Sequence, residues 1–162
     1  MNYFELFGFE EAPVIDKKLL SEKYFLLQKQ HHPDFFTRGN EAEQEEALAQ
    51  SADINKAFTT FQNEDKTIEY FLQTKGIVET DEKYQLPNDF LMEMMEINET
   101  LEEKDGVTVT AELAAIEKDL YGQIEPILKD RTLHHNTTSL ETLKSYYYKK
   151  KYIQRILARL GD

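Results

Sequence analysis

Two amphipathic segments meet at the sequence Gln30-His31-His32-Pro33-Asp34-Phe35-Phe36. On both sides of it, apolar residues recur at steps of four and three, which is the spacing of one helix face. The stripes are Leu20, Tyr24 and Leu27 before it, and Ala47, Ser51, Ile54, Phe58 and Phe61 after it. Pro33 ends the first helix, because proline disfavours the α conformation of the residue before it. Two helices joined by so short a connection predict an antiparallel hairpin.

Capping residues before the hairpin extend the helical prediction toward the N-terminus. Asp16 is the expected N-cap of the first long helix. Further out, Asn2 and Glu5 have the spacing of a capping box for a short helix, which Gly8 ends. We expect this short helix to close over the hairpin.

The second half of the chain also has the pattern of helices. An amphipathic piece over residues 63–76 is expected to link the halves, and the polar stretch 78–83 is the expected boundary. One helix should run from Pro87-Asn88-Asp89 to about Lys104 and stop at Asp105-Gly106. A second should start at Thr110 and bend or break at Gly122 and Pro126. A third should start at the capping box of Thr138 and Glu141. Three helices with short connections predict an antiparallel bundle, so the expected fold class is all-α.

The composition narrows the classes of function. The chain has 162 residues and a net charge of −12, from 31 acidic against 19 basic side chains. Such a chain repels phosphate backbones, so we expect neither nucleic acid nor an anionic membrane as a partner. It has no cysteine, which excludes disulfides and thiolate-held metal clusters. No apolar run approaches a membrane span and the first residues lack the basic start of a signal peptide, so we expect a cytoplasmic protein.

Three motifs together resemble the HscB-type J-domain co-chaperones of iron–sulfur cluster assembly. They are Tyr3-Phe4-Glu5-Leu6-Phe7-Gly8, His32-Pro33-Asp34 and Phe90-Leu91-Met92-Glu93. The resemblance covers essentially the whole chain and respects the spacing between the motifs. It implies a J-domain over residues 1–75, a linker over 76–84 and a scaffold-binding three-helix bundle over 85–162. The chain departs from the family at His31, where tyrosine is usual, and at Phe35, where lysine is usual.

The resemblance gives the hairpin turn a function. Taken alone, Pro33 is a helix stop and Asp34 a turn former. In the family, this turn and the basic helix before it bind an ATPase chaperone of the HscA or DnaK type and stimulate its ATP hydrolysis. The residues that match the family's contact pattern are Lys23, Lys29, His32, Pro33 and Asp34. None of them is expected to be catalytic in this chain.

A second apolar face is predicted on the helix that starts at Pro87. Phe90, Met94, Ile97 and Leu101 form a complete core stripe, and Leu91, Met92 and Met95 fall outside it. A neighbouring segment could cover these three, or they could be scattered surface side chains. The resemblance implies instead that this face binds the IscU-type scaffold protein on which the cluster is assembled. The matching positions are Leu91, Met92, Met95, Glu96, Glu99 and Glu103, completed by an aromatic of the last helix, Tyr146 or Tyr147, of which we take Tyr147.

Two other functions compete with this one. A J-domain adaptor could serve a different client protein, and a helical hydrolase could use His32 and Asp34 as acid and base. Adjacent histidines, as in His31-His32 and His134-His135, point to different faces of a helix and do not have the spacing of metal ligands. We therefore expect no metal, no cofactor and no enzymatic activity of this chain alone.

Overall fold

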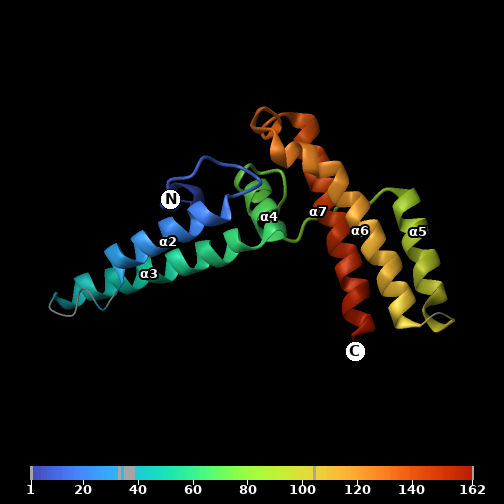
Figure 1. Ribbon diagram of the computed structural model, residues 1–162, viewed down its shortest axis with the longest axis horizontal. Coiled ribbons are helices and arrows are strands. Elements are labelled where there is room, and N and C mark those ends of the chain that lie inside the picture. Colours follow the sequence, from blue (N-terminus) through green and yellow to red (C-terminus); the bar gives the residue numbers. More distant parts are fainter. Residues whose placement is uncertain (1, 33, 35–38, 104, 162) are drawn as a thin grey trace. The chain divides into compact units, whose positions relative to one another are not determined.

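The computed structural model describes residues 2–32, 34, 39–103 and 105–161. Every regular element in these described ranges is a helix, as Figure 1 shows. The chain divides into two compact units, residues 1–74 and 75–162. Each unit has its own buried core, and each is described by itself below.

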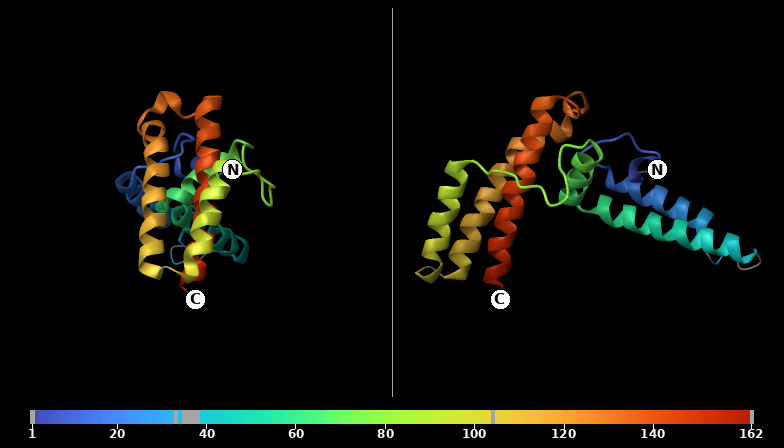
Figure 2. Two further views of the ribbon diagram at one scale, coloured as in Figure 1. Left: turned by 90° about the vertical axis from the view of Figure 1, so that its right-hand side faces the viewer. Right: turned by 180° about the vertical axis from the view of Figure 1, so that it is seen from behind.

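The first unit is a helical hairpin with one short helix at each end. It contains α1 (Tyr3–Phe7), α2 (Lys17–His31), α3 (Glu41–Gln62) and α4 (Glu64–Thr74). Helices α2 and α3 run antiparallel and side by side in Figures 1 and 2. The predicted caps Asn2 and Asp16 are present, since each side chain accepts a hydrogen bond from a backbone N–H of its helix, and Asn40 caps α3 in the same way. Gly8 ends α1 with a φ of 70°, a conformation that favours glycine.

Aromatic side chains fill the core of the first unit. Phe4, Phe61 and Phe71 are all completely buried. The ring of Phe61 lies 5.1 Å from that of Phe4, which joins α1 to α3. The prediction that residues 63–76 link the two halves is wrong, because α4 belongs to this core. Ile68 and Leu72 of α4 are buried together with Phe71.

The second unit is a bundle of three helices. It contains α5 (Asn88–Glu99), α6 (Gly106–Lys129) and α7 (Thr137–Leu160), with short 3₁₀ turns at Thr100–Glu102 and Arg131–Leu133. Figure 2 shows the three helices packed along one another, with α6 and α7 antiparallel. Met94, Leu113 and Ile153, one from each helix, are completely buried at its centre.

Three predicted helix boundaries in this unit are wrong. The helix α5 ends at Glu99 and passes into a 3₁₀ turn, so it does not continue as an α-helix toward residue 104. Asp105 does not stop a helix but caps the next one, since its Oδ1 accepts from the backbone N–H of Thr108 at 2.6 Å. Therefore α6 starts at Gly106, one turn before Thr110. Likewise, α7 is capped by Asn136, two residues before Thr138.

Helix α6 continues through the two residues that were expected to interrupt it. Gly122 and Pro126 both lie inside the helix, which runs without a break to Lys129. A proline removes one backbone donor, and burial of neighbouring apolar side chains compensates for that loss. Ile124 and Ile127, on either side of Pro126, are both in the core.

Candidate functional site

The turn between α2 and α3 presents His32 and Asp34 to solvent. His32 caps α2, and its backbone N–H donates to the carbonyl of Gln28 at 2.8 Å. The backbone N–H of Asp34 donates to Nδ1 of His32 at 3.2 Å. The same nitrogen lies 3.5 Å from Oδ2 of Asp34, and the two side chains are 44% and 85% exposed. Pro33 and Phe35, on which the sequence analysis also relied, lie outside the described residues.

The contacts of His32 depend on its protonation. Nδ1 can accept the N–H of Asp34 only when that nitrogen carries no proton, which places the proton of the neutral ring on Nε2. The same nitrogen faces the carboxylate of Asp34, so the ring and the carboxylate lie together at the turn.

A shallow hollow lies beside this turn. It has a volume of about 400 Å³ and is lined by Phe25, Gln28, Lys29, His32 and Asp34, and we call it the turn hollow. Three of the five residues predicted to contact a chaperone therefore meet at one surface.

Hydrogen bonds across the hairpin hold Gln28, one of the residues that line the turn hollow. The side-chain amide of Gln28 donates to Oδ1 of Asn55 at 2.9 Å. The hydroxyl of Ser51 donates to Oε1 of Gln28 at 2.9 Å. The hydroxyl of Tyr24 also donates to Oδ1 of Asn55, at 2.7 Å. In this part of the hairpin, α2 and α3 are therefore joined by hydrogen bonds between polar side chains.

Two lysines of α2 are engaged within the first unit. Nζ of Lys23 donates to the carbonyl of Gly8 at 3.1 Å and lies 4.5 Å from the centre of the Phe9 ring. Lys23, predicted as a chaperone contact, does not line the turn hollow. Nζ of Lys17 donates to the last two carbonyls of α3, those of Phe61 and Gln62. Burial lowers the pKa of Lys17. Lys29, by contrast, is exposed.

Helix α5 carries exposed apolar side chains outside its buried stripe. Three of the four residues of the predicted core stripe, Phe90, Met94 and Ile97, are buried, whereas Leu101 lies in the 3₁₀ turn and is half-buried. Met92 is 63% exposed and Met95 is 55% exposed. The remaining predicted residues are half-buried Leu91 and exposed Glu96, Glu99 and Glu103. We call these six side chains, namely Leu91, Met92, Met95, Glu96, Glu99 and Glu103, the α5 face.

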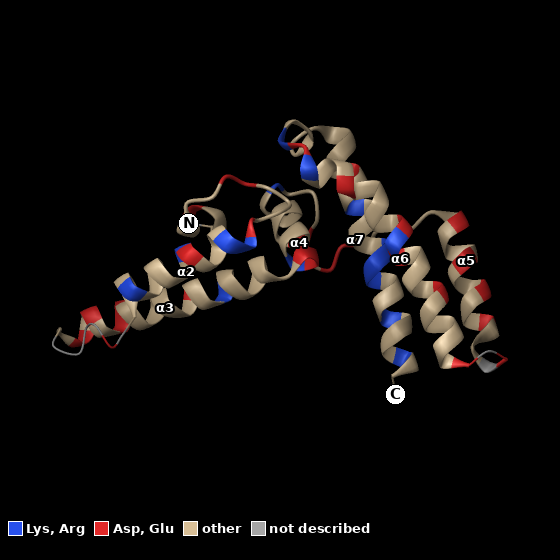
Figure 3. Cartoon of the chain, in the orientation of Figure 1, with Lys and Arg blue, Asp and Glu red and all other residues tan. Residues whose placement is uncertain are grey.

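The α5 face is acidic. Helix α5 contains Asp89, Glu93, Glu96 and Glu99 and no basic residue, as the red bands in Figure 3 show. Between α5 and α6, a hollow of about 470 Å³ has Glu93, Glu96 and Glu112 among its lining residues. A partner that covers the methionines would therefore meet carboxylates around them, which favours a partner with basic side chains.

Tyr146 and Tyr147, the two aromatic side chains of α7 considered for the scaffold site, differ in exposure. Tyr146 is 4% exposed and so belongs to the core. Tyr147 is half-buried, with its ring 4.9 Å from that of Tyr148. Tyr152 packs on α5, since its ring lies edge-on at 6.0 Å from the ring of Phe90. This contact between α5 and α7 was not predicted, because the sequence pattern gives no register between helices that lie far apart in the chain.

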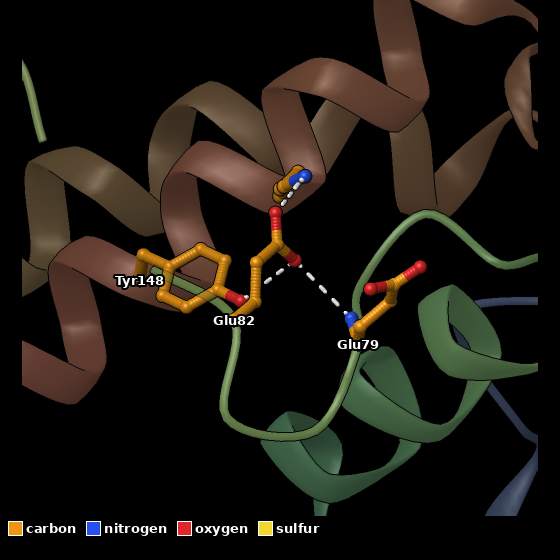
Figure 4. Close-up of polar contacts among 4 residues, drawn as sticks. Glu79, Glu82 and Tyr148 are labelled. Atoms are coloured by element: carbon orange, nitrogen blue, oxygen red, sulfur yellow. Dashed lines mark hydrogen bonds and ion pairs between the residues drawn. The ribbon is translucent and has the colours of Figure 1, made fainter. Parts of the chain in front are cut away.

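The segment before α5 is bonded to α7. Figure 4 shows Glu82 at the centre of three contacts. Its Oε2 lies 2.6 Å from Nζ of Lys144, and its Oε1 accepts from the hydroxyl of Tyr148 at 3.0 Å and from the backbone N–H of Glu79 at 3.1 Å. The ring of Tyr84 stacks on Tyr148 at 4.4 Å. This part of the stretch predicted as a linker is thus ordered on the bundle.

Replacement of Glu82 by glutamine should destabilise the second unit by about 1 kcal/mol at pH 7, since it removes a charged partner of Lys144. The hydrogen bond from Lys144 lowers the pKa of Glu82 below its ordinary value of 4.5. Its contribution is therefore present above that value and lost as the pH falls through the lowered pKa. We expect the difference between wild type and variant to shrink on acidification to pH 3, in urea titrations followed by the NMR signals of α7 amides.

The matched control for this experiment is Glu79→Gln. Glu79 contacts Glu82 through its backbone N–H, which the substitution leaves in place. The control should keep the stability of the wild type. Equal losses for both variants, or a loss for Glu82→Gln that grows at low pH, would contradict the assigned ion pair.

Other candidate residues have structural roles. His134 is 5% exposed and its Nε2 lies 3.2 Å from the carbonyl of Leu128, so it fixes the connection between α6 and α7. Within the described ranges, no group of three or more histidines and carboxylates is placed to hold a metal ion. Among the same residues, no helix has the length and apolarity needed to cross a bilayer.

Comparison with known proteins gives matches over the whole chain. Residues 86–161 match the family model described as the HSCB C-terminal oligomerisation domain. The co-chaperone protein HscB homolog of Colwellia psychrerythraea is 32% identical over 161 residues, which cover 96% of this chain and 92% of that protein. The homolog of Vibrio cholerae serotype O1 is 42% identical over 103 residues, or 63% of this chain and 60% of that protein.

Solved structures agree with the fold. The crystal structure of human co-chaperone protein HscB matches 99% of this chain and 81% of the human chain, with a TM-score of 0.80. The two sequences are 24% identical, so this match shows the fold alone. The chaperone HscB from Vibrio cholerae matches 99% of both chains with a TM-score of 0.63 at 30% identity. The predicted all-α fold class, a J-domain followed by a helical bundle, is confirmed.

Proposed function

Because this chain belongs to the HscB co-chaperone family, we propose that it binds two proteins and links their activities. The first unit binds an ATPase chaperone of the HscA or DnaK type and stimulates its ATP hydrolysis. The α5 face of the second unit binds the IscU-type scaffold protein of iron–sulfur cluster assembly. The observation that carries the first half of this proposal is the exposure of His32 and Asp34 beside Lys29 at one surface.

The turn acts on the chaperone by binding. Its local hydrogen bonds hold His32 and Asp34 together before docking, so little conformational entropy is lost when a partner binds them. Lys29 supplies a point charge that speeds the encounter with an acidic surface. A ligand that binds the hydrolysis-competent state of the chaperone more tightly shifts the population toward that state. The chemistry of ATP hydrolysis then belongs to the chaperone.

The α5 face acts on the scaffold protein. Met92 and Met95 are flexible and polarisable, so they adapt to an apolar partner surface. The carboxylates around them fix which partner surfaces can approach. The cluster itself is cargo of the scaffold protein, since this chain has no cysteine to bind it as a thiolate. One chain that holds both proteins raises the local concentration of scaffold at the chaperone.

The steady-state ATPase rate of the chaperone tests this function. We expect this protein to raise the rate severalfold, and addition of the scaffold protein to raise it further. An unchanged rate with both proteins present would disprove the proposal. Stimulation that the scaffold protein does not alter would favour the J-domain adaptor for a different client.

The hydrolase alternative has a test of its own. We propose that the chain is not an enzyme, and a hydrolase would be active without any partner protein.

Localisation in the cytoplasm stays a prediction, which imaging of a tagged chain can check.

A further inference from the structure

An exposed aromatic side chain borders the turn hollow. Phe25 is 68% exposed, although phenylalanine is usually among the buried residue types. It shares the hollow with Gln28, Lys29, His32 and Asp34. The proposed function assigns no role to this ring.

The position of Phe25 on α2 explains its exposure. Leu20, which is 1% exposed, marks the core face of the helix, and a residue five positions later lies roughly 140° around the axis. A lone exposed apolar side chain is common and indicates little by itself. Here a second one lies on the same side of the hairpin. Leu48 is 62% exposed and lies seven residues before Asn55, so the two residues share one face of α3. Asn55 on that face accepts the hydrogen bond from Gln28.

Two lysines of α2 lie on the same side of the helix as Phe25. Lys18 lies seven residues before it and Lys29 four residues after it, which places all three on one side of α2. Helix α2 carries four lysines and one acid, Glu22, in a chain whose net charge is −12. Figure 3 shows these blue bands along α2. Such a surface is complementary to an apolar side chain with carboxylates beside it.

We propose that Phe25 is the apolar anchor of the chaperone interface. Its ring packs against an apolar side chain of the ATPase chaperone, and carboxylates next to that side chain pair with Lys29 and Lys18. The inference rests on the proposed function, because it names the residue that gives the turn surface its affinity for that partner. Charge alone would give a fast but weak encounter, whereas a buried aromatic ring slows dissociation.

The test compares two neighbouring apolar residues of α2. In Phe25→Gln, the concentration that gives half-maximal ATPase stimulation should rise about tenfold or more, with the maximal rate unchanged. Leu26 follows Phe25 directly, so it points roughly 100° away from Phe25 around the axis of α2. It is 56% exposed and does not line the turn hollow. Leu26→Gln should therefore behave as the wild type. Far-UV circular dichroism checks that both variants keep their helices.

Two further measurements separate the possible outcomes. The salt dependence of binding should be unchanged in Phe25→Gln and weaker in Lys29→Gln, because only Lys29 carries charge. Equal half-maximal concentrations for Phe25→Gln and Leu26→Gln, with a wild type that stimulates normally, would overturn this inference and leave the proposed function intact. A wild type that does not stimulate would instead overturn the proposed function. Sedimentation would reveal whether the wild type forms a dimer that Phe25→Gln dissociates. If it does, and ATPase stimulation is unchanged in the variant, a second copy of the chain covers the ring and the inference is wrong.

Discussion

Replacement of His32 by glutamine should reduce the ATPase rate of the chaperone to its unstimulated value. The substitution removes the imidazole whose Nδ1 accepts the backbone N–H of Asp34. It leaves the cap of α2 in place, since that bond uses the backbone N–H of His32. Loss of one exposed hydrogen bond costs about 0.5–1 kcal/mol, so the fold should survive. The measurement is the steady-state ATPase rate at saturating concentrations of the variant.

A neighbouring histidine provides the control for His32→Gln. His31 is the last residue of α2 and is half-buried, so His31→Gln makes the same chemical change one residue away. We expect this variant to stimulate the chaperone. Helical content and scaffold binding should be unchanged in both variants. A His32→Gln protein with full activity would refute the role of the turn.

The double substitution Leu91→Ala and Met95→Ala should weaken scaffold binding about 100-fold, which corresponds to the loss of one or two interface hot spots. Both side chains lie outside the buried stripe of Phe90, Met94 and Ile97, so the bundle should remain folded. Isothermal titration calorimetry with the scaffold protein measures the effect. ATPase stimulation by the variant without scaffold protein should be normal, because the turn is untouched.

An exposed apolar residue of another helix provides the control for the α5 face. Val107 is 81% exposed near the start of α6, and Val107→Ala removes apolar surface there instead. This variant should bind the scaffold protein as the wild type does. Unchanged binding of the double variant would show that the α5 face is not the scaffold site. Tyr152→Ala, next to Phe90, tests in the same assay whether the α7 aromatic takes part.

Local signals were sufficient to predict the hairpin. Asp16 caps α2 as expected, and the stripe from Ala47 to Phe61 lies on the buried face of α3. These predictions succeeded because each depends on residues within one or two turns of helix. The buried stripe of α5 was predictable for the same reason.

The errors arose where two local signals compete or where the partner is distant. Asp105-Gly106 has the residues of both a helix stop and a helix start, and the structure uses it as a start. The ion pair of Glu82 with Lys144 joins residues far apart in the chain, so no local pattern indicates it. The same limitation hid Tyr152, since its position against Phe90 follows from packing between two helices.

The hydrogen bonds of Gln28 with Ser51 and Asn55 have a consequence for the motion of the hairpin. Leu20 is the one described residue of α2 that is buried, and it lies near the end of the helix away from the turn. Polar contacts can exchange with water at small cost, whereas apolar contacts cannot. The backbone amides of α2 nearer the turn should therefore exchange with solvent faster than those around Leu20, while the contact of His32 with Asp34 within the turn stays formed. A partner bound across α2 and α3 would slow this exchange.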